Sequence, residues 1–385
     1  MDRKQKYYAL NTKLSYLSDK DINELKKENE LSGYSKTYIT TIDDIKIFVK
    51  KIPMTKLEYD NQFSTANLYN LPAFYNYSYS LGSAGINCNR ELLTHIKTTN
   101  WVLNDKIENF PLMYHYRIMK NTNPVKKNVD LNEYIKKWNN DDNIKKYLLA
   151  RDNAEYEIMI CLEYFPHILG QWIKTNMDKM DSYIEQIMKI TNIFHDNNII
   201  HFDTHDWNIM TDGKIFYLTD FGLVMDLEFD LADDEKEFYK HNTYYQFASV
   251  IHNIFRPLFR MIYKEKDYFD KIYDLSDDMS EENRFNVINN NLAEICNHLK
   301  CSSSYLNLLK KYWNISKVFN VFGDNMRHNN KKDNEFPNDD IKELINKSQI
   351  GGNYYKYKKY KTKYLSLKHS SFVNLIGGKP NLLLV

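Results

Sequence analysis

The sequence predicts an α+β fold in two parts, a strand-rich N-terminal part followed by a helical part. β-branched residues flank a turn in TYITTIDDIKIFVKKIP (37–53), which is typical of two antiparallel strands, and residues 110–119 and 156–165 have a similar strand-like composition. From about residue 180 the apolar residues recur at helical spacing, as in DSYIEQIMKITNIFHDNN (181–198). The change of period therefore separates a sheet from a set of helices.

The composition is that of a globular protein without a strong overall charge. The chain has 385 residues, 43% of them hydrophobic, and its 52 Lys and Arg residues against 51 Asp and Glu residues leave a net charge of +1. No overall field therefore attracts it to nucleic acid or to an anionic membrane. No apolar run approaches the ~18 residues of a membrane span, residues 1–16 do not resemble a signal peptide, and the four cysteines share no C-x-x-C spacing. We expect a soluble, intracellular protein.

Changes in composition divide the chain into five segments. They are a polar extension that is helical in part (1–30), a strand-rich part with insertions (31–166), a helical part (167–322), a polar linker (323–350) and a Tyr/Lys-rich tail (351–385). In the tail, Tyr357, Tyr360 and Tyr364 share one helical face, with lysines on the other. We expect this face to pack on the body or on a partner. The alternative is a basic aromatic surface for nucleic acid or virion components.

The polar segment IIHFDTHDWNIM (199–210) carries the residues of greatest chemical interest. His201, Asp203 and His205 alternate and would face one way from a strand, as the metal ligands of hydrolases do. A further ligand set is not evident elsewhere in the chain. A zinc or iron hydrolase is therefore the minor alternative.

A longer pattern that includes the same segment resembles the protein-kinase-like superfamily. His201, Asp203 and Asn208 form H-x-D-x-x-x-x-N, and twelve residues after Asn208 comes Asp220-Phe221-Gly222, an order that resembles the catalytic and metal-binding loops of kinases. Upstream, IFVKKIP resembles the strand of the phosphate-binding lysine, NRELLTH the helix of its glutamate partner, and IMICLEYF the hinge. The resemblance runs from about residue 30 to about residue 320. It implies a bilobal fold with a small antiparallel-sheet lobe, one key helix, and a larger helical lobe.

The resemblance assigns the reacting groups. Phosphoryl transfer needs positioning and charge neutralisation more than covalent chemistry. Asp203 would accept the proton of the acceptor hydroxyl, and Asn208 and Asp220 would hold Mg²⁺, which prefers hard oxygen ligands. His201 would brace the loop, and His205, two residues after Asp203, is a further candidate catalytic residue.

The resemblance also assigns the ATP site. Lys50 would hold the α and β phosphates of ATP, with Glu91 orienting it. Because about forty residues separate these two positions, Glu58 is kept as an alternative partner. Gly33 would belong to the phosphate loop. The residues expected around adenine are Leu162, Glu163 and Phe165.

The sequence departs from the kinase pattern at several positions. Only Gly33 occurs before Gly82, Phe202 replaces the Arg of H-R-D, and no proline lies between residues 166 and 257. Gln246 takes the place of the Asp that lies beneath the catalytic loop. His205 stands where protein kinases have Lys. With it, the pattern H-x-D-x-H-x-x-N is similar to that of aminoglycoside and choline phosphotransferases.

The expected function is Mg·ATP-dependent phosphotransfer, as a serine/threonine protein kinase. The alternatives are a small-molecule phosphotransferase and a pseudokinase that acts as a scaffold. The acidic segment 226–237 suggests a basic peptide acceptor. Three segments resemble the kinase-like proteins of mimivirus-type giant viruses: the tail, NFPLMYHYRI and RELLTHIKTTNWVL. This resemblance implies that the protein is located in the host cytoplasm or in a virion.

Overall fold

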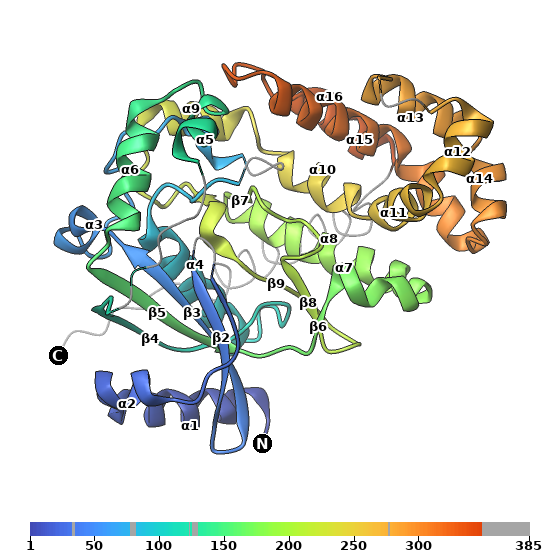
Figure 1. Ribbon diagram of the computed structural model, residues 1–385. Helices are drawn as coiled ribbons and strands as arrows, with labels where there is room; N and C mark the ends of the chain where they lie inside the picture. Colours follow the sequence, from blue (N-terminus) through green and yellow to red (C-terminus); the bar gives the residue numbers. More distant parts are fainter. Residues whose placement is uncertain (33–34, 78–81, 123, 125–129, 276–277, 349–385) are drawn as a thin grey trace, which may run out of the picture. The chain divides into compact units, whose positions relative to one another are not determined.

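The computed structural model describes residues 1–32, 35–77, 82–122, 124, 130–275 and 278–348. These residues form an α+β structure in which an antiparallel sheet is followed by a mostly helical chain (Figure 1). The α+β class predicted from the sequence is confirmed. Residues 1–341 form one compact unit, and a second unit begins at Lys342. The predicted tail, 351–385, lies outside the described residues.

Five of the described strands form the main sheet, in the order β1-β2-β3-β5-β4, and every neighbouring pair is antiparallel. The strands are β1 (Glu28–Ser32), β2 (Lys36–Ile42), β3 (Ile45–Met54), β4 (Met113–Lys120) and β5 (Tyr156–Glu163). The predicted hairpin is confirmed: Ile42 pairs with Ile45, and Asp43 and Asp44 between them have φ of 47° and 63°. Two successive left-handed residues suit the twist of a two-residue hairpin. Because β3 lies between β2 and β5, Lys50 stands inside the sheet.

Helix α4 (Cys88–Leu103) is the prominent helix of the N-terminal part. Asn87 begins it, since its side-chain oxygen accepts a hydrogen bond of 2.9 Å from the Asn89 amide. The helix shares one apolar cluster with the sheet, which consists of Ile52, Met54, Cys88, Leu92, Met113, Ile158, Ile160 and Leu162. Burial of each large side chain contributes roughly 1.5–3 kcal/mol. This packing holds the first turn of α4, with Glu91, against β3.

The insertions in the N-terminal part form packed helices and turns. They contain α3 (Lys56–Asp60), the 3₁₀ turn η1 (Ala73–Asn76), α5 (Leu131–Lys136) and α6 (Asp142–Asp152). A second apolar cluster forms around Trp138, which is fully buried, with the Tyr75 ring edge-on at a centroid distance of 4.7 Å. An aromatic pair in this arrangement adds about 0.5–1.5 kcal/mol beyond its buried area.

The N-terminal extension is helical, as predicted, and forms α1 (Arg3–Tyr16) and α2 (Asp19–Glu24). Helix α1 packs against β4 and buries Leu10 and Leu14. Arg3 pairs with Glu163 at the end of β5, with 2.6 Å between Nη2 and Oε2. The extension is therefore attached to the sheet along its length.

The chain after β5 is mostly helical. Its short strands are β6 (His167–Ile168), β7 (Ile199–His201), β8 (Ile209–Thr211), β9 (Phe216–Leu218) and β10 (Val224–Asp226). Strand β7 pairs with β10, and β8 pairs with both β6 and β9. Its first helices and turns are α7 (Leu169–Trp172), η2 (Ile173–Thr175), η3 (Met177–Lys179), α8 (Met180–Asp196), η4 (Phe221–Leu223), α9 (Asp233–Lys240) and α10 (Tyr245–His252). These are followed by α11 (Arg256–Lys264), α12 (Lys266–Tyr273), α13 (Glu281–Asn290), α14 (Leu292–His298), α15 (Ser303–His328) and α16 (Asn338–Lys347).

The predicted boundary at residue 322 lies inside a helix. Helix α15 continues to His328, and α16 forms within the segment predicted as a polar linker. Asp339 and Asp340 stand in the first turn of α16, where they complement the helix dipole, and Ile341 is fully buried. The polar composition of residues 323–350 therefore did not indicate that part of this segment is helical. In the ranges that the structure describes, no helix is long and apolar enough to cross a membrane.

Helices α10 and α15 meet at His252, which makes stability depend on pH. Its Nδ1 lies 2.9 Å from Ser316 Oγ, and burial, assisted by Arg256, lowers its pKa to about 3. In the unfolded chain the pKa is about 6.5, so the unfolded state binds the proton more tightly. The stability that neutral His252 contributes is therefore complete above about pH 6.5 and is lost towards pH 3, by about 1.4 kcal/mol per unit.

We expect His252→Gln to remove this contribution from the pH dependence. The measurement is the free energy of denaturant unfolding between about pH 7 and about pH 5 for both proteins. Between these two pH values the wild type should lose about 2 kcal/mol more of its free energy of unfolding than the variant. Parallel slopes would show that His252 titrates normally in the folded protein.

Candidate active site

Lys50, Glu91 and Asp220 form a cluster of three charges. Lys50 Nζ lies 2.6 Å from Glu91 Oε1 and 2.8 Å from Asp220 Oδ1. The three residues come from β3, from the first turn of α4 and from the turn before η4. The side chains of Lys50 and Glu91 keep 11% and 5% of their exposure, whereas Asp220 keeps 44%. Asp220 is therefore the most exposed member of the cluster.

Electrostatics keep Lys50 and Asp220 charged at neutral pH. Burial alone would lower the pKa of Lys50, but Asp220 and Glu91 outweigh it, and the pKa lies above its ordinary value. Burial alone would raise the pKa of Asp220, but the Lys50 ammonium outweighs it and lowers this pKa to about 2. The pKa of Glu91 is raised, because its burial outweighs the attraction of Lys50. An ionised carboxylate is thus present at the exposed edge of the cluster.

The structure pairs Lys50 with Glu91 and gives Glu58 a different role. The Glu58 side chain is fully buried, and its Oε2 accepts a hydrogen bond of 2.8 Å from the Thr55 amide. Its Oε1 accepts one of 2.9 Å from the Cys88 amide. Glu58 therefore caps the first turns of both α3 and α4. It supports the helix that carries Glu91.

Asp203 and Asn208 lie on the loop between β7 and β8. Asn208 Nδ2 donates to the backbone oxygen and to Oδ2 of Asp203, at 2.9 Å in each case. Both partners are acceptors, so these bonds fix which end of the amide is the NH₂ group. Asn208 Oδ1 accepts no hydrogen bond from the described residues. It is a free hard oxygen, suited to Mg²⁺.

Both ring nitrogens of His201 are engaged in holding the loop. Nδ1 accepts a hydrogen bond of 3.1 Å from the Asp203 amide, and Nε2 lies 3.1 Å from the Thr219 carbonyl. An accepting Nδ1 makes Nε2 the protonated nitrogen, which donates to that carbonyl. Burial lowers the pKa of His201, in agreement with a neutral ring. His201 is therefore a brace of the loop, as the resemblance implies, and offers no nitrogen to a metal.

His205 stands beside Asp203. Its Nε2 lies 3.3 Å from Asp203 Oδ1, and its Nδ1 accepts a hydrogen bond of 3.2 Å from the Trp207 amide. Nε2 therefore carries the proton and donates it towards the carboxylate. Together with Asn208, His205 fixes the orientation of the Asp203 carboxylate.

One cavity joins most of these groups. It has a volume of about 390 Å³, and Lys50, Glu91, Asp203, His205 and Asp220 all line it. The described residues 82–85 form another part of its wall. Gly33 lies outside the described residues.

The three residues expected around adenine are not in the wall of this cavity. Leu162 belongs to the apolar cluster between α4 and the sheet. Glu163 uses its side chain to hold Arg3 and its amide to donate to the Leu112 carbonyl at 2.9 Å. The Phe165 ring stacks on Tyr217, with 3.7 Å between ring centroids.

The loop at Gly85 packs against the turn that carries Asp220. Gly85 has φ of +81°, and a Cβ there would lie 2.5 Å from the Gly222 carbonyl oxygen. A Cβ on Gly222 would in turn lie 3.3 Å from Glu91 Oε2. Position 85 therefore requires glycine, and at Gly222 a Cβ would be tightly placed against the Glu91 side chain. Gly85 lies outside the motifs that the sequence offers, although two glycines in LGSAG are the local signal for such a close approach.

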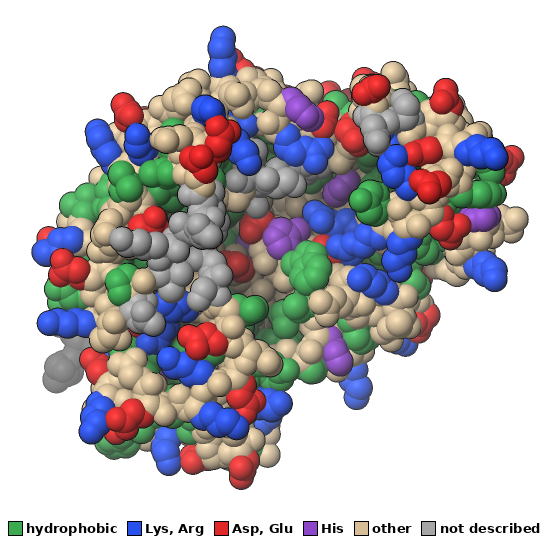
Figure 2. Space-filling model, in the orientation of Figure 1, with side chains coloured by type: hydrophobic (Ala, Val, Ile, Leu, Met, Phe, Trp, Pro, Cys, Tyr) green, Lys and Arg blue, Asp and Glu red, His purple; other side chains and the backbone are tan. Residues whose placement is uncertain are grey.

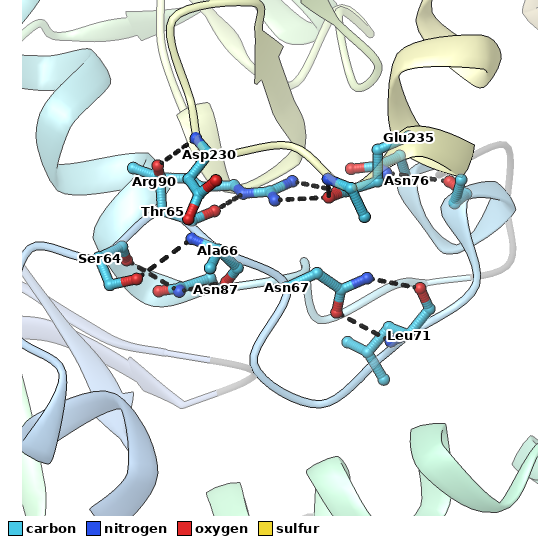
Figure 3. A network of polar contacts seen from close by, with 12 residues as sticks. Ser64, Thr65, Ala66, Asn67, Leu71, Asn76, Asn87, Arg90, Asp230 and Glu235 are labelled. Carbon is cyan, nitrogen blue, oxygen red and sulfur yellow. Dashed lines mark hydrogen bonds and ion pairs between the residues drawn. The ribbon is translucent and has the colours of Figure 1, made fainter.

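A buried ion pair fixes α4 relative to α9 (Figure 3). Arg90 Nη1 lies 2.7 Å from Glu235 Oε1, and Arg90 Nη2 lies 3.1 Å from Glu235 Oε2. Arg90 Nε donates to the Thr65 carbonyl at 2.8 Å. The two charged side chains retain 2% and 0% of their exposure. A bidentate pair adjacent in sequence to Glu91 orients the turn on which Glu91 stands. No motif in the sequence indicates either partner.

The structure accounts for two departures from the kinase pattern. Phe202 is buried, and its ring contacts those of Tyr77, Phe238 and Tyr245. Gln246 lies beneath the loop, as expected, and its Oε1 accepts a hydrogen bond of 3.1 Å from the His201 amide. An apolar cluster and an amide thus support the loop in place of charged groups.

Within the part of the chain that the structure describes, no group of three or more His, Cys, Asp or Glu side chains is arranged to hold a metal ion. No protein-family model matches the chain, and no curated protein matches it. The function of the site is therefore inferred from its geometry.

Proposed function

We propose that this protein transfers the γ-phosphate of ATP to the hydroxyl of a protein serine or threonine, with Mg²⁺, in a bilobal kinase-like fold. The observation that carries the proposal is the convergence of Lys50, Glu91, Asp203 and Asp220 on one cavity. They come from four separate segments of the chain, so their meeting is a property of the fold. The main sheet with α4 would be the small lobe and the chain after β5 the large one.

Each group suits a role in phosphoryl transfer. The Lys50 ammonium, fixed between two carboxylates, is placed to bind phosphate oxygens. Asp220 and the free Asn208 Oδ1 supply an anionic and a neutral oxygen, and two protein ligands suffice because Mg²⁺ takes phosphate oxygens and water as well. The bound ion would neutralise charge on the transferred group. Asp203, held by Asn208 and His205, is placed to accept the acceptor's proton.

The structure modifies the expectation for adenine. The Glu163 amide already donates to Leu112, whereas the Phe165 amide makes no hydrogen bond with the described residues. Of the three residues expected around adenine, Phe165 is therefore one whose backbone amide is available to the base, although it does not line the cavity. The Glu163 side chain serves α1 through Arg3.

The direct test is incubation with Mg²⁺ and γ-labelled ATP, comparing the wild type with Asp203→Asn. The isosteric amide keeps the size of the side chain but cannot accept a proton, so transfer should fall by about 100- to 10,000-fold while ATP affinity persists. Asp178→Asn, which alters an exposed carboxyl in η3, is the matched control and should leave transfer unchanged.

The outcomes separate the alternatives. Label on protein in the wild type and not in Asp203→Asn supports a protein kinase. ATP consumption without labelled protein favours a small-molecule acceptor, for which the contact between His205 and Asp203 is the specific support. Folded wild-type protein that binds ATP but does not consume it would contradict the proposal and favour a scaffold.

A further inference from the structure

A second cavity, of about 1070 Å³, extends from Asp203 along α11. Gly82, Asp203 and His205 line both this groove and the first cavity. A molecule in the groove would therefore reach Asp203. The volume lies at the upper limit of about 300–1,000 Å³ for small-molecule sites, and the groove is open to solvent. These dimensions suit an extended segment of polypeptide.

Basic side chains dominate the charged lining of this groove. Apart from Asp203, the charged residues in the described part of its wall are Lys174, Arg256, Arg260, Lys264 and Arg327. Figure 2 shows blue side chains gathered to the right of a central hollow that contains red and purple ones. Arg327 is offset by Asp324, at 2.8 Å, so the other four determine the local charge.

Two of these four share a single carboxylate. Asp206 Oδ1 lies 3.5 Å from Arg256 Nη1, and Asp206 Oδ2 lies 2.6 Å from Arg260 Nη2. Arg260 also donates to the Gly170 carbonyl at 3.1 Å. The Asp206 side chain is 3% exposed, while the two arginines keep 33% and 29%. One negative charge against two positive charges leaves an excess of one, on guanidinium groups that are held in place and still exposed.

The remaining two charges are unmatched. Lys174 and Lys264 are both exposed, and neither forms an ion pair with any residue in the described ranges. Trp207, on the loop between Asp203 and Asn208, is 47% exposed and adds an apolar ring to the same wall. With the Asp203 carboxylate counted, the groove thus combines an excess of about two positive charges with an aromatic contact next to the candidate base.

We propose that this groove binds an acidic polypeptide segment and presents a Ser or Thr of that segment to Asp203. This inference rests on the proposed function and specifies its substrate class. Charge complementarity favours carboxylates beside the arginines and lysines and opposes a basic segment. It replaces the basic acceptor suggested by residues 226–237, because none of those residues lines the groove. Asp226 pairs with Lys97 and Glu235 with Arg90.

The experiment compares fluorescent peptides that carry one serine and have acidic, neutral or basic flanking residues. Binding is measured by anisotropy without ATP, for the wild type and for Lys174→Glu/Lys264→Glu. The control is Lys189→Glu, an exposed position on α8 outside the groove. We expect the acidic peptide to bind at least about tenfold more tightly than the others, in a salt-sensitive manner, and the double variant alone to lose this preference.

Equal or tighter binding of the basic peptide would overturn the inference, as would acidic binding that the double variant retains. Tighter binding of a single-stranded RNA of equal charge would also overturn it, because the groove would then be a nucleic-acid site. The same peptides are then offered with Mg²⁺ and γ-labelled ATP. Selective binding of the acidic peptide without phosphate transfer would support the charge selectivity of the groove and contradict the proposed function. Failure of the inference and failure of the proposed function are therefore distinguishable.

Discussion

Asp220→Asn is expected to lower phosphate transfer by about a thousandfold and to abolish the part of ATP affinity that depends on Mg²⁺. The amide has the same size but no charge, and Asn208 is already neutral. The site would then offer a divalent cation no ionised ligand at its exposed edge. Lys50 would keep its contact of 2.6 Å with Glu91, so the phosphate-binding cation stays in place.

Two measurements separate this effect from simple loss of structure. ATP affinity is determined with Mg²⁺ and with a chelator, and thermal unfolding is followed without ligand. The variant should bind ATP equally in both conditions and should unfold close to the wild type, because the Asp220 side chain is 44% exposed. Full transfer, or an undiminished response to Mg²⁺, would refute the assignment of Asp220 as a metal ligand.

Glu235→Ala is expected to lower the free energy of unfolding by about 3–5 kcal/mol. Its removal leaves the Arg90 guanidinium buried, with only the Thr65 carbonyl as a partner among the contacts of Figure 3. The measurement is denaturant unfolding at neutral pH. Glu237→Ala, on the same helix, is the matched control: Glu237 pairs with Lys240 at the surface, so this variant should change stability little.

A double variant tests whether the pair also positions the site. Replacing both charges, as Arg90→Met with Glu235→Leu, removes the unpaired ion and should recover most of the stability. Reduced transfer in this stable protein would show that the ion pair orients Glu91, whereas transfer at the wild-type level would show that it serves stability alone. Glu235→Ala protein as stable as Glu237→Ala would contradict the importance of the pair altogether.

Local sequence accounts for much of the fold. The β-branched runs around Asp43 and Asp44 predict the hairpin, and the spacing of apolar residues predicts α4 and α8. These features depend on residues a few positions apart, where propensity and turn chemistry act directly. Helix α15 continues past residue 322, which composition did not indicate, because a polar surface helix and a polar linker have similar composition.

The candidate site was likewise predictable from the sequence only in part. The order of Lys50, Asp203, Asn208 and Asp220 in the chain was sufficient to select the groups that line or adjoin one cavity. Proximity in space selected the partners: Glu91 over Glu58 for Lys50, Glu235 for Arg90, and Asp206 for two arginines. Charges separated by tens of residues leave no periodic signal, and a buried ion is stable only where packing brings its counter-ion within hydrogen-bond distance. Residue type and spacing therefore determined which chemistry is present, and tertiary packing determined which charges meet and which stay free to bind a ligand.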